Sequence, residues 1–220
     1  MAVLDFISQV HKATKRDYLE RVVAHDKAEC AAIAGQWGFD YWDGDRKYGF
    51  GGMRYDGRWL PIAQRIAAHY GLKPGMRVLD VGCGKAFLLY ELTQAVPGLE
   101  IAGLDISAYA VENAKPECQP FLKVGSATDL PWPDGHFDLV ISINTFHNLF
   151  NYELDKALAE MTRVGKGVGF VCVEAYRNDH EKVNLLYWQL TCRTFHTPAE
   201  WQYAYDRAGY SGDCDFIYFE

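Results

Sequence analysis

A short apolar run that ends in two closely spaced glycines constrains the fold of this chain most. The segment VLDVGCG, residues 78–84, passes directly into a helix-like pattern. Such a run is typical of a buried parallel strand, and Gly82 and Gly84 at its end let the backbone approach a ligand with its amide N–H groups. A second apolar run, residues 99–104, ends at Asp105. Together the two runs predict the first β-α-β unit of a parallel sheet.

The glycine turn and Asp105 also describe a pocket for a ligand that contains a nucleoside. A carboxylate at the end of a second strand can accept two hydrogen bonds from a ribose diol. A dinucleotide is disfavoured, because the third glycine of the G-x-G-x-x-G fingerprint is Phe87 in this chain. The G-x-x-x-x-G-K-[ST] pattern of a nucleotide-binding P-loop is also missing from the sequence.

The glycine turn resembles motif I of the class I S-adenosylmethionine-dependent methyltransferases, which usually reads acidic-x-G-x-G-x-G. Asp80, Gly82 and Gly84 match it, and Ala86 replaces the third glycine. Residues 124–140, VGSATDLPWPDGHFDLV, resemble the G-D-A-x-x-L-P-F and S-F-D-x-V regions of the same family. The resemblance covers roughly residues 57–220 and is closest to the small-molecule "type 11" branch.

This resemblance implies S-adenosylmethionine as the cofactor and S-adenosylhomocysteine as the product. It implies that Asp105 holds the ribose, that Ile106 lies against the adenine and that the glycines pass under the methionine part. Ser126 stands where the family usually has an aspartate, and a hydroxyl accepts from the adenine amino group more weakly. The expected cofactor residues are Asp80, Gly82, Cys83, Gly84, Asp105, Ile106, Ser126, Ala127 and Asn144.

The alternation of apolar runs and helical patterns predicts an α/β fold with a doubly wound, mostly parallel sheet of the Rossmann-like methyltransferase type. Strands are expected at residues 76–81, 99–104, 120–124, 137–143 and 168–173. Helices are expected at residues 57–70, 85–95, 107–114, 151–163 and 198–208, and Trp188–Cys192 also has a helical pattern. A strand at 215–219 and a weaker one near Tyr210 suggest the antiparallel hairpin that is usual in the family. Residues 1–56 are predicted to form a helical, glycine- and aromatic-rich lid on a methyltransferase domain at 57–220.

Methyl transfer from a sulfonium is an in-line displacement, so the protein mainly positions the acceptor and removes its proton. His147 follows the fourth predicted strand, and its ordinary pKa near 6.5 suits a base at neutral pH. A histidine that anchors the adjoining loop is the competing interpretation. Glu174 and Tyr176, which follow the fifth strand, are alternative catalytic groups, and His196 is a weaker one.

The substrate residues expected are Tyr48, Arg54, Tyr55, Arg58 and Arg177. Arginine forks match carboxylates and phosphates, so an anionic substrate is expected if two of these arginines face the pocket. The family resemblance implies methylation of oxygen or nitrogen on a small metabolite, and its branch suggests a sugar-like one. Pairing of these arginines with Asp56, Asp43 or Glu174 is the alternative. A protein or peptide side chain, and a binding-only role without catalysis, are the rival functions. Lys85 is expected to be exposed to solvent.

Charge, hydropathy and cysteine content limit the classes of binding partner and the compartment that we expect for this protein. The formal net charge is −7 and the calculated pI is near 5.5, which disfavours nucleic acid as a partner. No apolar run approaches the ~20 residues of a membrane span, and the N-terminal residues lack a signal-peptide pattern. Six cysteines without a C-x-x-C pair indicate free thiols in a reducing compartment. We therefore expect a cytoplasmic protein, with no metal, no membrane partner and a possible homodimer.

Overall fold

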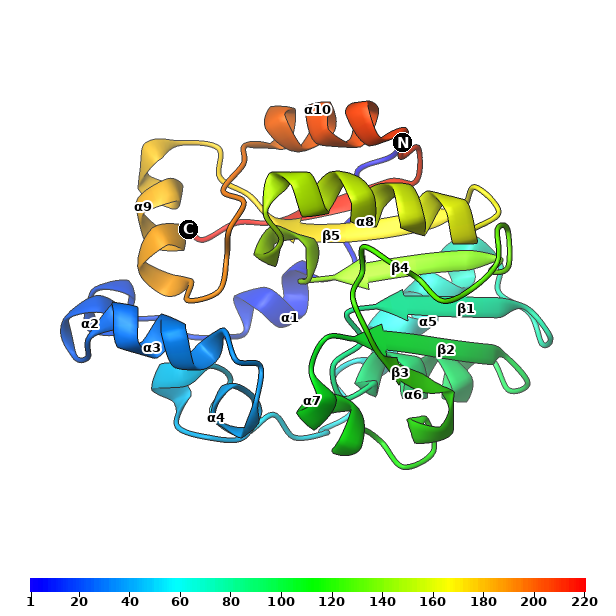
Figure 1. The fold of residues 1–220 in the computed structure, drawn as a ribbon, viewed down its shortest axis with the longest axis horizontal. Helices are drawn as coiled ribbons and strands as arrows, with labels where there is room; N and C mark the ends of the chain where they lie inside the picture. Colours follow the sequence, from blue (N-terminus) through cyan, green and yellow to red (C-terminus); the bar gives the residue numbers. More distant parts are fainter.

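The core of the protein is a six-stranded sheet with the strand order β3-β2-β1-β4-β5-β6, and every pair of neighbours is parallel (Figure 1). The computed structural model describes residues 1–220 apart from the side chain of Gln9. The strands are β1 (Arg77–Val81), β2 (Glu100–Asp105), β3 (Leu122–Val124), β4 (Leu139–Ile143), β5 (Gly169–Glu174) and β6 (Asp213–Ile217). The predicted doubly wound α/β class is confirmed.

Helices cover both faces of this sheet. One face carries α5 (Leu60–Tyr70) and α6 (Phe87–Ala95), and the other carries α8 (Asn151–Val164) and α10 (Pro198–Ala208) (Figure 1). The strand residues alternate between the two resulting cores. In β5, Phe170 packs with the α5–α6 side, whereas Val171 packs with the α8–α10 side. Both faces are therefore apolar, which explains why these strands read as continuous apolar runs.

The shorter elements connect these layers or precede them. They are α1 (Ser8–Lys12), α2 (Tyr18–Val23), α3 (Lys27–Ala34), α4 (Phe39–Trp42), η1 (Arg46–Tyr48), α7 (Ala108–Glu112), η2 (Gln119–Phe121), η3 (Phe146–Asn148) and α9 (Asp179–Trp188). Ser107 begins α7 as expected, because its hydroxyl accepts from the amide of Ala110. Gly209 ends α10 in the left-handed conformation.

The prediction of an antiparallel hairpin in the last residues is wrong. β6 pairs with β5 in parallel, with Phe170 opposite Asp213 and Glu174 opposite Ile217. The chain between them runs through α9 and α10, and such a crossover returns it in the original direction. Tyr210 forms no strand. Its ring is buried and its hydroxyl donates to the carbonyl of Asp213 over 2.8 Å.

The helical pattern at Trp188–Cys192 is also misleading. Trp188 is the last residue of α9, and Gln189 is already extended, with φ −75° and ψ 138°. Residues 189–197 cross the carboxyl end of β4 as a loop. In this loop the amides of Arg193 and Thr194 both donate to the carbonyl of His147, which follows β4. Tertiary hydrogen bonds of the backbone thus replace the helical ones that the pattern suggested.

The N-terminal residues fall into two structural parts. Phe6 and Ile7 are buried in the core on the α5–α6 side, and Val3 forms a parallel bridge to Cys214 of β6. The elements α2, α3 and α4 instead lie beyond the carboxyl ends of the strands (Figure 1). We call residues 35–56, which include α4 and η1, the strap. The division of the chain at residue 56 stays a prediction.

Two further expectations concern the whole chain. All six cysteines are buried, and none forms a disulfide in the described structure. In the part of the chain that is described, no helix combines the length and the apolar character that crossing a membrane requires.

Candidate cofactor and substrate site

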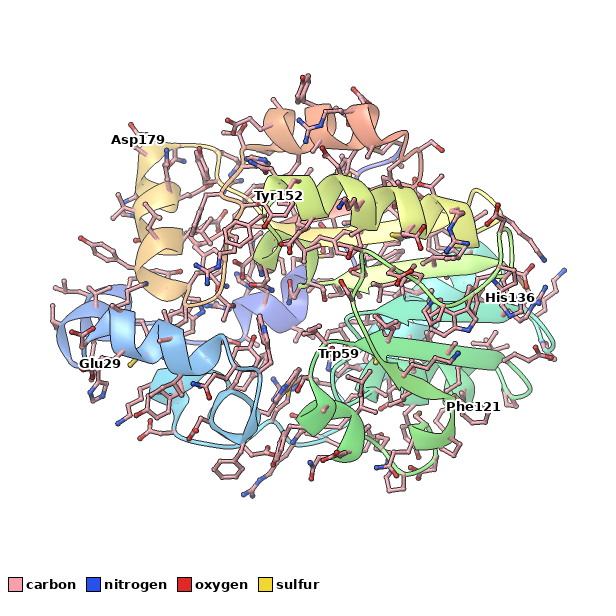
Figure 2. All side chains as sticks on the ribbon, viewed as in Figure 1. Glu29, Trp59, Phe121, His136, Tyr152 and Asp179 are labelled. Carbon is pink, nitrogen blue, oxygen red and sulfur yellow. The ribbon has the colours of Figure 1, made fainter. Side chains whose placement is uncertain are left out.

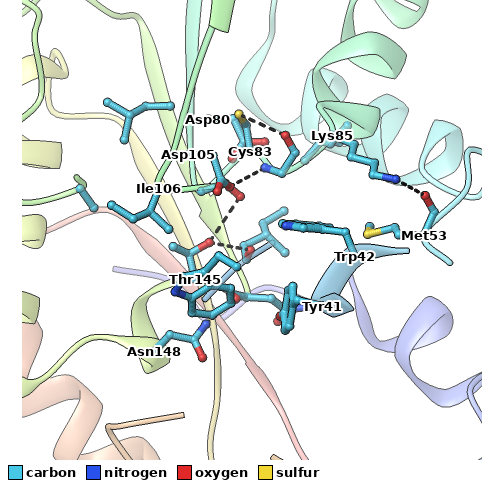
Figure 3. Close-up of a pocket in the computed structure, with 18 of the residues that line it drawn as sticks. Tyr41, Trp42, Met53, Asp80, Cys83, Lys85, Asp105, Ile106, Thr145 and Asn148 are labelled. Atoms are coloured by element: carbon cyan, nitrogen blue, oxygen red, sulfur yellow. Dashed lines mark hydrogen bonds between the residues drawn. The ribbon is translucent and has the colours of Figure 1, made fainter. Parts of the chain in front are cut away.

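A cavity of about 350 Å³ lies at the carboxyl ends of β1, β2, β3 and β4, under the strap (Figure 3). In open parallel sheets this is the edge where ligands bind. The cavity lining includes every cofactor residue that the sequence predicts, namely Asp80, Gly82, Cys83, Gly84, Asp105, Ile106, Ser126, Ala127 and Asn144. The structure therefore brings this predicted set together from four different strand ends.

The glycine turn passes close to its neighbours, as its spacing suggests. Gly82 and Gly84 have φ values of +84° and +52°, which favour glycine. A Cβ on Gly82 would overlap the side chain of Thr145, and one on Gly84 would lie 2.8 Å from the Trp42 ring. Ala86, which replaces the third glycine of the motif, is buried and also left-handed at φ +60°. The backbone shape of the motif is kept at this position despite the change of residue.

Two buried carboxylates face the cavity. Asp105 accepts from the amides of Gly84 (2.7 Å) and Ser107 (2.8 Å), and burial raises its pKa despite these bonds. Burial, together with the charge of Asp105, raises the pKa of Asp80 to about 8. Among the described residues, neither carboxylate has an ion-pair partner within 4.0 Å. The site therefore suits a ligand that brings positive charge and hydroxyl donors.

Lys85, just before α6, binds the strap through an ion pair and a hydrogen bond. Its ammonium lies 2.6 and 2.7 Å from the two oxygens of Asp43. It also donates to the carbonyl of Met53 over 3.0 Å (Figure 3). The hydroxyl of Tyr109 donates to the same carboxylate. The expectation that Lys85 is exposed is wrong, since only 6% of it is accessible. Its charge is neutralised inside the protein by a residue 42 positions earlier.

Aromatic side chains make up much of the cavity lining. Trp42 stacks on Phe50 with 5.4 Å between ring centroids, and its indole N–H donates to the Ser107 hydroxyl over 2.9 Å. Trp37 holds a left-handed backbone at φ +54°, which is rare for a bulky residue and is often found at binding sites. The aromatic residues in the lining are Trp37, Tyr41, Trp42, Phe50, Trp59 and Phe87.

Trp42 and Lys85 are site residues that sequence reasoning missed in these roles. The segment DYWDG, residues 40–44, carries the necessary signal, an indole next to a carboxylate in a glycine-rich stretch. The sequence does not reveal, however, which cation this carboxylate meets.

The predicted catalytic groups lie beside the cavity, and its described lining does not include them. His147 is 3% exposed, and burial lowers its pKa to about 3. Its Nδ1 accepts from the amide of Glu174 over 3.4 Å, and its Nε2 lies 3.6 Å from the Glu174 carboxylate. Tyr176 is half-buried, with the ammonium of Lys182 over its ring. This geometry fits the competing interpretation of His147 as an anchor, and a catalytic role stays a prediction.

The predicted substrate residues are also outside the described lining of the cavity. Arg58 pairs with Asp56, as the local-pairing alternative suggested. Arg177 pairs with Glu181 and Glu220, and Arg54 is exposed. The remaining two are engaged elsewhere: Tyr55 donates to Glu91 over 2.7 Å, and the Tyr48 ring lies 4.8 Å from the ammonium of Lys47. The cavity thus gives no support to an anionic substrate through these residues.

Comparisons with known proteins agree with this geometry. Residues 79–173 match the family model described as "Methyltransferase domain". A demethylmenaquinone methyltransferase of Symbiobacterium thermophilum is 33% identical over 128 residues, which is 54% of this chain and 50% of that protein. The chain spans about half the length of the curated relatives that it matches first.

Solved structures show the same fold. One is a chain of the complex between the Haloferax volcanii Trm112 methyltransferase activator and the putative methyltransferase. It has a TM-score of 0.56 at 27% identity, over 67% of this chain and 66% of that one. Another is the YcgJ protein of Bacillus subtilis, with a TM-score of 0.55 at 23% identity over 70% and 68% of the two chains. Residues 79–173 therefore match a methyltransferase domain, and the parallel sheet has the fold of the class I S-adenosylmethionine-dependent methyltransferases.

Proposed function

We propose that this protein transfers the methyl group of S-adenosylmethionine to a small acceptor held between the strap and the sheet. The observation that carries the proposal is the pair Asp80 and Asp105, buried at one cavity without an ion-pair partner among the described residues. S-adenosylmethionine brings a sulfonium, an ammonium and a ribose diol, which supply the missing positive charge and hydroxyl donors. When bound, it supplies an activated methyl group for displacement.

Each part of the cofactor has residues of matching chemistry in the cavity. Asp105 suits the ribose diol, because each of its oxygens keeps a lone pair beside the amide that it already accepts. Asp80 suits the ammonium of the methionine part. Ile106, which is 57% exposed, offers an apolar face to the adenine, and Ser126 offers a hydroxyl to its edge. The turn at Gly82 and Gly84 leaves room for the chain between them.

The lining favours an uncharged, flat acceptor over an anionic one. Six aromatic side chains line the cavity, and Lys85, the lysine in this lining, is already neutralised by Asp43. The carboxylates of Asp105 and Glu153 in the lining would repel an anion. Several relatives bear the name demethylmenaquinone methyltransferase, which implies a quinone-type substrate for those proteins. We infer a hydroxyl or amine on an aromatic or similarly apolar small molecule as the group that is methylated.

Cofactor binding tests the first part of this proposal. Isothermal titration with S-adenosylmethionine and S-adenosylhomocysteine should give saturable binding to the wild type and a loss of at least about tenfold for Asp105→Ala. Asp129→Ala is the matched control, since Asp129 is an exposed carboxylate after β3. Circular dichroism verifies that each variant is folded. Absence of binding by the folded wild-type protein would refute the proposal.

Acceptor choice tests the second part. Labelled methyl transfer to 1-naphthol should exceed transfer to 1-hydroxy-2-naphthoate, which differs from it by one carboxylate. The same comparison between an arylamine and its carboxylated form extends the test to nitrogen. A clear preference for the carboxylated compounds, with cofactor binding intact, would contradict the inferred acceptor class and leave the methyltransferase assignment standing.

A further inference from the structure

Three arginines from separate elements surround one tryptophan outside the cavity. The guanidinium carbons of Arg16, Arg21 and Arg46 lie 5.3, 5.0 and 5.7 Å from the ring centroid of Trp188. Trp188 ends α9, Arg21 belongs to α2 and Arg46 begins η1 in the strap. Side chains of these elements fill the space between the N-terminal helices and α9 (Figure 2). The fold thus gathers three cations around a single aromatic ring.

Backbone carbonyls satisfy part of this cluster. Arg21 donates to the carbonyls of Trp188 and Arg46, and Arg16 donates to those of His11 and Thr14. Carbonyl partners supply hydrogen-bond acceptors but no opposite charge. The buried Nε of Arg16 has no partner, and the structure gives no hydrogen bond to the exposed guanidinium of Arg46. Arg16 and Arg46 therefore each keep donors without an acceptor near the Trp188 ring.

The nearby acidic groups do not balance these charges. Within 4.0 Å, none of the three arginines forms an ion pair with another described residue. Arg16 interacts at longer range with Glu174, whose buried carboxyl has a pKa raised to about 8 and is mostly protonated at neutral pH. The chain carries a formal charge of −7, so this local excess of positive charge stands against its overall composition.

Lys27 adds a fourth cation to the same place. Its ammonium donates to the carbonyls of Leu186 and Tyr187 at the end of α9. Burial, together with the charge of Arg21, lowers its pKa to about 8. Cations at a helix C-terminus are favourable in themselves, which explains Lys27 and Arg21. The position of Arg16 and Arg46 around the same ring is not explained by the helix end.

We propose that Arg16, Arg21 and Arg46 form a binding site for the phosphate group of a small molecule. Guanidinium groups bind phosphate oxygens in two-point fashion, and a dianion would offset charges that now repel one another. The arginines come from the segment before α2, from α2 itself and from the strap, and α9 supplies the ring between them. A bound phosphate therefore links the strap to α9. This site is separate from the methyltransferase cavity and does not depend on its proposed function.

Phosphate binding to the intact protein tests the proposal. Inorganic phosphate and pyrophosphate are titrated by calorimetry into the wild type and into Arg46→Gln, at constant ionic strength. Arg46→Gln should weaken binding at least tenfold and should reduce the rise in Tm that phosphate produces. Arg54→Gln is the matched control, because Arg54 is also an exposed strap arginine and lies outside the cluster. Its affinity should equal that of the wild type.

The outcomes separate the site from general charge effects. Sulfate should compete with phosphate, whereas chloride at equal ionic strength should not. The proposal is overturned if phosphate does not saturate the folded wild-type protein, or if Arg46→Gln and Arg54→Gln bind it equally. Binding of S-adenosylhomocysteine is measured on the same samples. If the wild-type protein binds phosphate but does not bind S-adenosylhomocysteine, the result counts against the methyltransferase assignment and leaves the phosphate site standing.

Discussion

Lys85, which directly follows the glycine turn, and Asp43 of the strap form a largely buried ion pair beside the cavity. The side chains of the two residues are 7% and 24% exposed. Burial by itself would raise the pKa of Asp43, but hydrogen bonds from Lys85 and Tyr109 outweigh it and lower that pKa. The strap is thus fastened by an ionised carboxylate at neutral pH, and this contribution is lost only as the pH falls below the usual range of aspartate.

Removing this carboxylate should loosen the strap. Asp43→Ala leaves the Lys85 ammonium buried without its partner, which we expect to cost about 1–3 kcal/mol of unfolding free energy. Limited proteolysis should then cut residues 35–56 faster, and S-adenosylhomocysteine should bind more weakly. Asp40→Ala, at an exposed strap position, is the control and should change neither quantity. Equal proteolysis of the two variants would contradict a fastening role.

Substitutions can separate the cost of the left-handed backbone at the glycine turn from the cost of steric overlap with Thr145. Gly82→Ala combines a left-handed backbone with overlap against Thr145, so we expect about 2–4 kcal/mol of destabilisation. Gly135→Ala has a similar φ of +59° with open space around it, and should cost only about 1 kcal/mol. Chemical denaturation measures both. Similar losses for the two variants would show that the contact with Thr145 yields easily.

Cofactor binding should depend on pH through Asp80. Its pKa is about 8 in the folded protein against 3.8 for an ordinary aspartate, so the folded state holds an extra proton between these pH values. Stability conferred through Asp80 therefore falls as the pH rises across that window. A cationic ligand needs the ionised form, so its affinity should rise by up to about tenfold per pH unit toward pH 8 and then level off.

Proton release during calorimetry checks this dependence. Titrations near pH 7 in buffers of different ionisation enthalpy should show that binding of S-adenosylmethionine releases protons. Asp80→Asn should reduce this release, while the contribution from the cofactor's own amino group remains. Unchanged proton release in the variant would assign the effect to a group other than Asp80.

His147→Ala distinguishes an anchoring role from a catalytic one. The substitution creates a space and leaves the Glu174 amide without its acceptor, so we expect about 2–3 kcal/mol of destabilisation. The buried imidazole has a pKa of about 3 and protonates near 6.5 once unfolded, so its contribution to stability declines as the pH falls below 6.5. The variant should lose this acid sensitivity yet bind S-adenosylhomocysteine normally. Loss of the acidic limb of a pH–rate profile, where a general base is protonated, would instead support the predicted catalytic role.

The sequence predicts the parts of this structure whose signals are local. β1, β2, β4 and β5 lie within about two residues of the predicted bounds, because their apolar runs end at glycine or at polar turns. The expected cofactor residues also line one cavity, since the strand ends of a parallel sheet converge on one edge. Glycine spacing and strand ends are thus sufficient to locate the cavity.

The sequence does not reveal which residues that are distant in the chain come into contact. Arg177 meets Glu181 and Glu220, and Lys85 meets Asp43, so charge type alone did not reveal which cations face a ligand. The direction of β6 was also hidden, because it depends on the path of α9 and α10 across the sheet. Side-chain pairing and crossover paths are set by tertiary packing, which weakly periodic segments do not encode.

The bridge between Val3 and Cys214 has a consequence for the order of folding. Backbone hydrogen bonds join Leu4 to Cys214 and Cys214 to Ala2, so residues near the start of the chain cover the outer edge of β6. A ribosome makes these two partners 211 residues apart, and such distant contacts form slowly. The N-terminal segment therefore stays unpaired until β6 has been synthesised. Until then β5 is the exposed edge, where a nascent chain is most exposed to pairing with a neighbour.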